Sequence, residues 1–487
     1  MAHTDSSREN KPYSLIPENG NESHQLLHEG TDEEVICYGS KIDYKKTFLY
    51  YLCCLLSCGF FVLVGYWRPD WRHKWTHSMC PFQEADSVFI KDQYNRWYPA
   101  KILQLVDNTR RENSNGKQMI HETNDDPTDA LGNGTNPLDV KYFKFHCLRY
   151  FWNPQIQHFT VLRGLDRNFT CREIYDRFSR GLDNHQAGRR AIIYEQNLID
   201  VKVKSYIRLL FEVALNPFYV FQVFSVTLWF FDDYYYYAGC IVFVSVVSIA
   251  ITLVQTRRNR VRLRNMVATS SNIQVIRNHS GDPENVSSTE IVPGDVIVIP
   301  PDGIRMECDA VLISGSCVVN ESSLTGESNP VLKTQLISDG ADADNVYYPN
   351  LHKQHSLFAG TQVLQARSYS SSLVTALVIR TGFYSMKGNL VRSILYPKPM
   401  NLKLYRDAIG FVGCLAFLAL IGLIYSIVTL IIDGVTPGEV IKRALDMITI
   451  AVPPALPAAV SIGTVYATNR LRVRGIFCIN PSRYLLL

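Results

Sequence analysis

The sequence predicts a multi-pass α-helical membrane protein with a cytosolic β-rich domain between two membrane hairpins. Apolar runs of about 20 residues recur along the 487-residue chain, and each is long enough to cross a hydrocarbon core. A long polar stretch between two pairs of these runs holds short apolar patches separated by Gly and Pro turn signals, a pattern typical of β-strands. The mean hydropathy of −0.03 is too polar for a chain that lies entirely in a membrane. A net charge of only +4 argues against a nucleic-acid partner.

Five such apolar runs occur, and charged residues flank them. This number disfavours the alternative that the runs are buried helices of a large soluble protein. Lys and Arg gather after the third run, before the fourth and after the fifth, so these ends are expected in the cytosol. The sequence therefore predicts a first transmembrane hairpin over 207–255 and a second over 406–467. The runs themselves are 48–67, 209–231, 238–254, 409–432 and 447–467.

The first run has basic residues on both sides, with Lys45 and Lys46 before it and Arg68 after it. Both of its ends are therefore expected to stay in the cytosol. We interpret residues 46–67 as a re-entrant segment that bends near Gly59. The alternative is a single span, which would place residues 1–45 outside the cytosol.

The first 45 residues are polar and rich in Ser, Asn and Glu, so a disordered cytosolic tail is expected over 1–45. Glu22, Leu26 and Leu27 form an acidic dileucine pattern of the kind that sorts proteins to endosomes and lysosomes, although a pattern this short also arises by chance. Residues 68–206 are expected to form an amino-terminal cytosolic domain.

The β-rich domain is expected over 256–405, as a distorted barrel or sandwich. It contains Thr325-Gly326-Glu327-Ser328, in which a glycine beside an acid sits on a predicted turn. A carboxylate held out on such a turn can orient a water molecule as a general base. The alternative is an ordinary solvated turn.

The fifth apolar run contains Pro453-Pro454-Ala455-Leu456-Pro457. Because proline lacks an N–H and clashes one turn back, the carbonyls of Thr449, Ile450 and Pro453 lose helical donors. Unwound carbonyls inside a membrane can coordinate a cation, so this break is a candidate substrate site. The alternative is a simple kink.

With these motifs in order, the chain resembles the P-type transport ATPases, whose actuator domain carries the Thr-Gly-Glu-Ser loop. The resemblance implies that Glu327 positions the water that hydrolyses an aspartyl-phosphate, with Thr325, Gly326 and Ser328 shaping the loop. It also implies ATP and Mg²⁺ in the complete pump, while no cofactor and no metal site are expected in this chain. No obligate subunit is expected.

The proline motif, with Ala455 at its centre, resembles the P5B branch, which includes polyamine exporters of late endosomes and lysosomes. The resemblance implies a polyamine substrate, acidic phospholipids as membrane partners and a late endosomal or lysosomal location, with the endoplasmic reticulum or plasma membrane as alternatives. Asp446 lies about two helical turns before Pro453 and suits a polycation. The alternative is an interfacial acid paired with Lys442 or Arg443. The predicted substrate-binding set is Asp446, Thr449, Ile450, Pro453, Pro454, Ala455 and Pro457.

Residues 468–487 resemble the start of the family's phosphorylation domain as far as Arg483, but the sequence contains no Asp-Lys-Thr-Gly. The chain is therefore interpreted as the amino-terminal half of a pump, truncated before that domain and inactive alone. One alternative is a non-catalytic truncated isoform that binds lipid or the full-length pump. A further alternative, transport of metal cations, lacks a His/Cys/Asp cluster with ligand spacing in the predicted spans.

Overall fold

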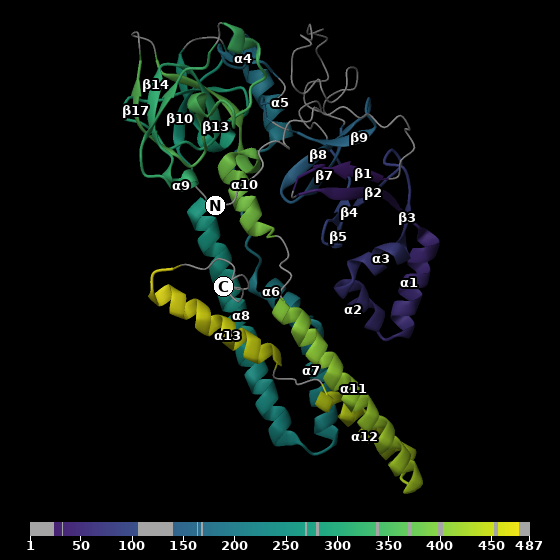
Figure 1. Cartoon of the computed structure of the whole chain (residues 1–487). Coiled ribbons are helices and arrows are strands. Elements are labelled where there is room, and N and C mark those ends of the chain that lie inside the picture. The colour runs from purple at the N-terminus through teal and green to yellow at the C-terminus, as the bar shows by residue number, and fades with distance from the viewer. Residues whose placement is uncertain are drawn as a thin grey trace. The chain divides into compact units, whose positions relative to one another are not determined.

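The computed structural model divides into two compact units, which are described separately (Figure 1). The first unit comprises Met1–Leu198 with Ser270–Arg392, and the second comprises Ile199–Thr269 with Ser393–Leu487. The chain therefore passes between the units at three points. The structure describes residues 24–31, 33–105, 140–162, 164–166, 169–267, 270–278, 282–337, 340–368, 373–397, 403–451 and 456–476.

The first unit begins with an amino-terminal β-domain of two antiparallel sheets. One sheet has the order β1-β2-β4-β5, with β3 paired to β2, and the other has the order β6-β7-β8-β9. Apolar side chains from both sheets, including Val88, Ile90, Phe143 and Tyr150, form one core. The strands are β1 His24–Leu27, β2 Val35–Ile42, β3 His77–Met79, β4 Ser87–Asp92, β5 Trp97–Lys101, β6 Leu103–Gln104, β7 Lys141–Phe145, β8 Leu148–Asn153 and β9 His158–Val161.

The predicted disorder of residues 1–45 is wrong for residues 24–42, which form β1 and β2. Leu27, Val35 and Cys37 are buried in the core, while Leu26 and Ile36 beside them are less buried, so burial alternates along this segment as in a strand with one covered face. Leu26 is 41% exposed but Leu27 is only 6% exposed, so one leucine of the dileucine pair is held in the core of this fold. Glu22 lies outside the described residues.

Three short helices follow β2: α1 Tyr44–Leu56, α2 Phe60–Trp67 and α3 Pro69–Thr76. The Asp43 carboxylate caps α1 by accepting the backbone N–H groups of Lys45 and Lys46. The chain turns between α1 and α2 at Gly59, whose φ of +89° is a conformation that favours glycine. With 13 and 8 residues, α1 and α2 are each too short to cross a bilayer alone.

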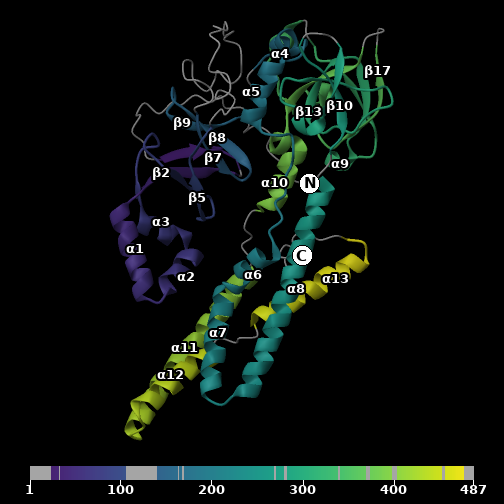
Figure 2. The same ribbon diagram turned by 180° about the vertical axis from the view of Figure 1, so that it is seen from behind.

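The second β-domain, formed by β10 to β18, packs two antiparallel sheets around a shared core (Figure 2). One sheet has the order β11-β10-β12-β18-β13-β16 and the other β15-β14-β17. Val275, Leu312 and Val378 of the larger sheet share their core with Val319 and Val363 of the smaller one. The strands are β10 Asn272–Ile276, β11 Pro283–Ser287, β12 Val296–Val298, β13 Asp309–Ser314, β14 Ser316–Asn320, β15 Val331–Thr334, β16 Ser356–Leu357, β17 Gln362–Arg367 and β18 Thr375–Arg380.

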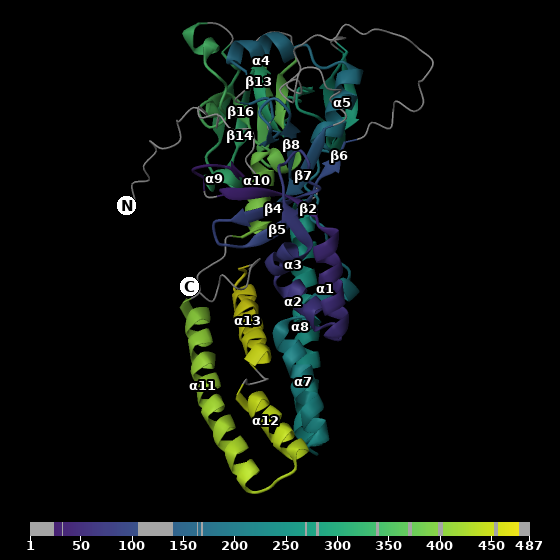
Figure 3. The same ribbon diagram turned by 90° about the vertical axis from the view of Figure 1, so that its right-hand side faces the viewer.

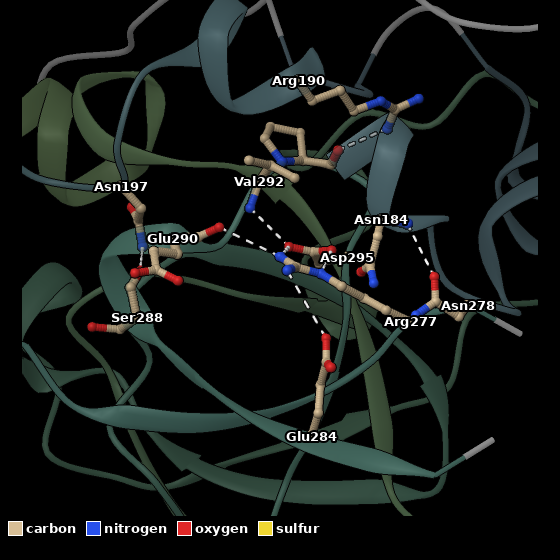
Figure 4. Close-up of polar contacts among 11 residues, drawn as sticks. Asn184, Arg190, Asn197, Arg277, Asn278, Glu284, Ser288, Glu290, Val292 and Asp295 are labelled. Atoms are coloured by element: carbon tan, nitrogen blue, oxygen red, sulfur yellow. Dashed lines mark hydrogen bonds and ion pairs between the residues drawn. The ribbon is translucent and has the colours of Figure 1, made fainter. Parts of the chain in front are cut away.

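Helices α4 Cys171–Phe178 and α5 Asn184–Tyr194 pack against this second β-domain. The buried Arg190 guanidinium donates a hydrogen bond of 2.7 Å to the Pro293 carbonyl (Figure 4). Asn197, just after α5, donates through its side-chain amide to the Ser288 carbonyl at 2.9 Å and accepts from the Gly382 N–H at 2.8 Å. These contacts attach the end of the segment Met1–Leu198 to the second β-domain.

Two ion pairs with fully buried carboxylates reinforce the same domain. The Arg277 guanidinium donates to both oxygens of Asp295, at 2.9 and 2.7 Å (Figure 4). The Arg380 guanidinium donates in the same forked way to Asp166, which lies before α4. Such bidentate pairs fix orientation as well as charge.

Helix α10, Met386–Leu395, also links the two β-domains of the first unit. The hydroxyl of Tyr384, just before α10, accepts the Arg149 N–H at 3.0 Å. The Arg392 guanidinium pairs with Glu33 at 2.7 Å. The amino-terminal β-domain is therefore tied to the second β-domain through both side chains and backbone.

The second unit consists of helices (Figure 3). They are α6 Tyr206–Ala214, α7 Pro217–Phe231, α8 Tyr235–Val267, α11 Lys403–Ile432, α12 Pro437–Ala451 and α13 Leu456–Val473. Helices α7 and α8 form a hairpin, in which the Gln222 side chain donates to the Ser245 hydroxyl at 2.5 Å. The predicted domain range 256–405 also takes in the last turns of α8.

Among the described residues, two helices are long and apolar enough to cross a membrane: α8 and the 413–432 part of α11. The pair α6 and α7, bent by 70°, would make a third if it is one span. The prediction of two complete hairpins is therefore supported only in part. Helix α12 carries Glu439, Lys442 and Arg443, and α13 ends with Arg470 and Arg472, which lowers the hydropathy of both.

Candidate functional site

The Thr-Gly-Glu-Ser motif lies on an exposed loop at the end of α9, Ser322–Thr325. Gly326 ends this four-residue helix with φ +80°, and its N–H donates to the Ser322 carbonyl at 3.0 Å. A left-handed residue at this position reverses the chain, and glycine adopts it without strain. Apart from the adjoining residues, no heavy atom of the part of the chain that the structure describes lies within 4 Å of the point that a Cβ on Gly326 would occupy.

The loop is held by hydrogen bonds that converge on Thr325. The Thr325 hydroxyl donates to the Glu321 carbonyl at 3.2 Å and accepts the Glu327 N–H at 3.2 Å. The Glu327 side chain itself is exposed, and across the described ranges its carboxylate enters no hydrogen bond or ion pair. The arrangement leaves a carboxylate that can receive a proton from a water molecule or contact a partner surface.

A buried ion pair, which the residue pattern does not predict, lies at the base of this loop. The Lys333 ammonium is 2.7 Å from the Glu321 carboxylate and donates to the Lys353 carbonyl at 2.8 Å. Lys333 is only 1% exposed, whereas its neighbour Leu332 is 58% exposed. This strand turns its charged side chain inward, which is the reverse of the usual polarity and gives no signal in the sequence pattern.

The predicted substrate residues lie around the gap between α12 and α13. Asp446, Thr449 and Ile450 belong to α12, where Thr449 is fully buried, and Pro457 is the second residue of α13. Pro453, Pro454 and Ala455 lie outside the described residues. α12 ends at Ala451, before the motif, and α13 begins within it at Leu456. Both helices belong to a different compact unit from Glu327.

No group of three or more His, Cys, Asp or Glu side chains in the described part of the chain could hold a metal ion. Within the Thr-Gly-Glu-Ser loop, the group that can act as a general base is the Glu327 carboxylate.

A cavity of about 230 Å³ lies in the amino-terminal β-domain beside α3. His73 is 7% exposed, and its ring centroid is 3.8 Å from that of Phe89 and 4.2 Å from that of His77. Burial, followed by the charges of His77 and Arg72, lowers the pKa of His73 to about 4. The lining residues are Ser40, Lys46, His73, Lys74, His77, Ser78, Met79 and Phe89.

Comparison with known families matches both β-domains. The P5-type ATPase cation transporter family matches residues 31–153, which cover most of the amino-terminal β-domain. The P-type ATPase actuator domain matches residues 268–395, which contain the second β-domain with α9 and α10. The Thr-Gly-Glu-Ser loop therefore lies within the matched actuator domain.

Curated relatives match nearly the whole chain. Human polyamine-transporting ATPase 13A3 is 43% identical over 482 residues, or 95% of this chain. Human polyamine-transporting ATPase 13A2 is 47% identical over 71% of the chain, and the chicken probable cation-transporting ATPase 13A4 is 39% identical over 96%. The chain covers 39%, 29% and 39% of the lengths of these three relatives. The chain belongs to the P5-type family of P-type transport ATPases, and within it to the P5B branch that includes the polyamine-transporting ATPases.

Proposed function

We propose that this chain supplies the actuator and the first membrane helices of an ATP-driven polyamine transporter. The observation that carries the proposal is the exposed Glu327 carboxylate on the left-handed turn at Gly326, within a domain that matches the P-type actuator. The similarity to two polyamine-transporting relatives supports polyamines as the substrate class. In the complete pump, ATP would donate its γ-phosphoryl group to an aspartate and leave as ADP, and Mg²⁺ would neutralise charge on the phosphates.

The role of Glu327 is to act as general base in hydrolysis of that aspartyl-phosphate. A water oxygen forms a bond to phosphorus while the bond from phosphorus to the aspartate oxygen breaks, and the water proton passes to Glu327. The products are inorganic phosphate and a free aspartate carboxylate. Thr325 and Gly326 contribute by fixing the backbone from which Glu327 projects, and Ser328 completes the exposed turn.

A chimeric pump tests this role. Residues 1–476 are joined to the corresponding remaining part of human polyamine-transporting ATPase 13A3, and decay of the phosphoenzyme is followed after a chase with unlabelled ATP. Glu327→Gln is expected to slow decay by about 10²–10⁴-fold while phosphoenzyme still forms. Asp302→Asn, which alters another exposed carboxylate in the same domain, is the control. Equal decay rates in the two variants would contradict the assignment.

The substrate path is proposed at the break between α12 and α13, where Asp446 and the carbonyls of Thr449, Ile450 and Pro453 attract the ammonium groups of a polyamine. Pro454 and Pro457, on either side of Ala455 and Leu456, disfavour a continuous helix here. In the chimera, Asp446→Asn is expected to abolish polyamine-stimulated ATP hydrolysis, and Glu439→Gln in the same helix is the control. If Lys442→Gln has the same effect, the alternative of an Asp446–Lys442 ion pair is favoured instead.

The 487 residues contain no Asp-Lys-Thr-Gly sequence, so we propose that this stretch of chain forms no phosphoenzyme by itself. Incubation of the purified polypeptide with labelled ATP tests this proposal, and acid-stable label on the chain would contradict it. The alternative role is that of a non-catalytic chain that binds lipid or the full-length pump. Co-purification of the tagged chain with a differently tagged full-length relative tests the second part of that alternative.

Acidic phospholipids are the proposed lipid partners of the amino-terminal β-domain. Helices α1 and α2 expose Phe48, Leu55 and Phe60, at 72%, 78% and 58%, and Lys46 and Lys74 line the cavity beside α3. Exposed apolar residues next to lysines suit a membrane surface of negative charge. Flotation with vesicles containing phosphatidic acid is expected to recover the chain, and Lys46→Gln/Lys74→Gln is expected to reduce recovery. Equal recovery with neutral vesicles would contradict the proposal.

Residues 46–67 are proposed to re-enter the membrane from the cytosolic side, with the bend at Gly59. A glycosylation site placed within residues 1–20 distinguishes this from a single span, because only a span exposes it to the lumen.

Late endosomes or lysosomes are the proposed location, with the endoplasmic reticulum and plasma membrane as alternatives that microscopy of the tagged chain separates. Metal-cation transport is the remaining alternative, and stimulation of the chimera by divalent metals but not by polyamines would favour it.

A further inference from the structure

We propose that Lys333 is a positioning residue for the Thr-Gly-Glu-Ser loop, acting through Glu321. This inference rests on the proposed role of Glu327 and adds the part of the domain that sets the direction of its carboxylate. Lys333 lies on β15, pairs in register with Cys317 of β14, and is 1% exposed. A lysine so deeply buried requires a partner for its charge.

The partners of the Lys333 ammonium come from two directions. On one side it lies 2.7 Å from the Glu321 carboxylate, and on the other it donates to the Lys353 carbonyl at 2.8 Å. It also lies 5.6 Å from the ring centroid of Phe358. These contacts fix the ammonium, and the ammonium in turn fixes the side chain of Glu321, which is 8% exposed.

Glu321 is the residue from which α9 starts. Its carbonyl accepts the N–H groups of Leu324 and Thr325, at 2.9 and 3.0 Å, as well as the Thr325 hydroxyl. The Thr325 hydroxyl then accepts the Glu327 N–H. A continuous series of contacts therefore runs from the buried ammonium to the backbone of Glu327.

A second anchor of α9 is the Ser323 hydroxyl, which donates to the Gly360 carbonyl at 3.0 Å. A helix of four residues has too few internal hydrogen bonds to be stable alone. Its orientation therefore depends on contacts outside its own turns, which also include the Ser322 N–H donating to the Asn320 side-chain oxygen at 2.9 Å. Of these contacts, the one through Lys333 carries charge. Loss of the ammonium leaves a buried carboxylate at the start of α9, which will turn toward water and take the loop with it.

Hydrogen exchange on the purified 487-residue chain tests the anchor directly. Lys333→Met is expected to raise amide exchange in residues 322–328 at least tenfold relative to the strands β13 and β18. Arg277→Met, which also removes the cation of a buried pair but on β10, is the matched control, expected to raise it less than threefold. Unchanged exchange of 322–328 in Lys333→Met would overturn the proposal.

The double variant Lys333→Met/Glu321→Gln separates positioning from simple stability. Without a buried unpaired charge, its unfolding temperature is expected to recover toward that of the parent, while exchange of residues 322–328 stays fast. Slow exchange in the double variant would overturn the proposal, and this variant decides the matter if Lys333→Met alone does not fold.

The rate of phosphoenzyme decay in the chimera tests whether Lys333 affects hydrolysis of the aspartyl-phosphate. Lys333→Met and the double variant are expected to slow decay at least tenfold without slowing phosphoenzyme formation. Slow decay with normal loop exchange would overturn the positioning role of Lys333. If the loop exchanges fast but Glu327→Gln leaves decay unchanged, the anchor is supported and the role of Glu327 fails.

Discussion

Lowering the pH from 7 to 5 should loosen the amino-terminal β-domain through His73. The Nε2 atom of this histidine is buried without a hydrogen-bond partner among the described residues, and the ring lies against Phe89 and His77. Protonation would place a charge in this site beside Arg72, whose own charge already contributes to the low pKa of His73. Burial and Arg72 also lower the pKa of His77, so its protonation acts in the same direction.

The sign and size follow from the pKa difference between the folded and unfolded states. The pKa of His73 is about 4 in the folded domain against an ordinary 6.5, so below pH 6.5 the unfolded chain binds a proton that the folded chain does not. Stability is therefore lost as the pH falls from about 6.5 toward 4. Linkage gives a loss of about 1.8 kcal/mol between pH 7 and 5, or a change of about 20-fold in the opening equilibrium.

Hydrogen exchange of β2, β4 and α3 in the full chain measures this change, after correction for the intrinsic pH dependence of exchange. The parent chain is expected to lose about 20-fold in protection between pH 7 and 5. His73→Leu removes the titrating group and should lose less than threefold, while His185→Leu, at an exposed position on α5, should behave like the parent. A loss in His73→Leu as large as in the parent would refute the reasoning.

Three further changes have defined outcomes in the first unit. Arg380→Met removes the cation that pairs in forked geometry with the fully buried Asp166 carboxylate and should lower the free energy of unfolding by about 3–5 kcal/mol; a loss below 1 kcal/mol by denaturant titration would contradict this. Burial raises the pKa of Asp309 to about 6, above its unfolded value, so its contribution should stabilise the second β-domain by about 1.3 kcal/mol as the pH falls from 7 to 5. Asp309→Asn should remove that gain, and a pH profile of unfolding that it leaves unchanged would argue against the assignment. Gly164→Ala would place a Cβ 2.0 Å from the Ile379 carbonyl oxygen and should lower the unfolding temperature by several degrees, whereas an unchanged temperature would show that the backbone moves freely there.

The sequence predicts the second β-domain well because its turn signals and apolar patches are local. The exposed position of Glu327 follows from the same kind of information, since a glycine beside polar residues predicts a turn. The strands β1 and β2 were missed because their apolar faces are short and their neighbour β4 begins at Ser87, far along the chain. Pairing over such a distance is not visible in local composition.

In the candidate site, too, features that depend on adjacent residues could be predicted, and features that depend on distant segments could not. The residues of the Thr-Gly-Glu-Ser motif are adjacent in the chain, so their loop could be predicted. Lys333 could not be identified, because its burial depends on the Lys353 carbonyl and the Glu321 carboxylate, which other segments bring to it. The residue types alone favour an exposed lysine.

The three chain crossings between the units have a mechanical consequence. They fall after Leu198, Thr269 and Arg392, and α8 runs almost to the second while α10 runs through the third. Asn197, beside the first crossing, is hydrogen-bonded to the second β-domain. Any movement of one unit relative to the other must therefore be accommodated at all three connections at once. Lengthening one of these connections with a flexible insert should therefore reduce how strongly a movement of one unit is passed on to the other.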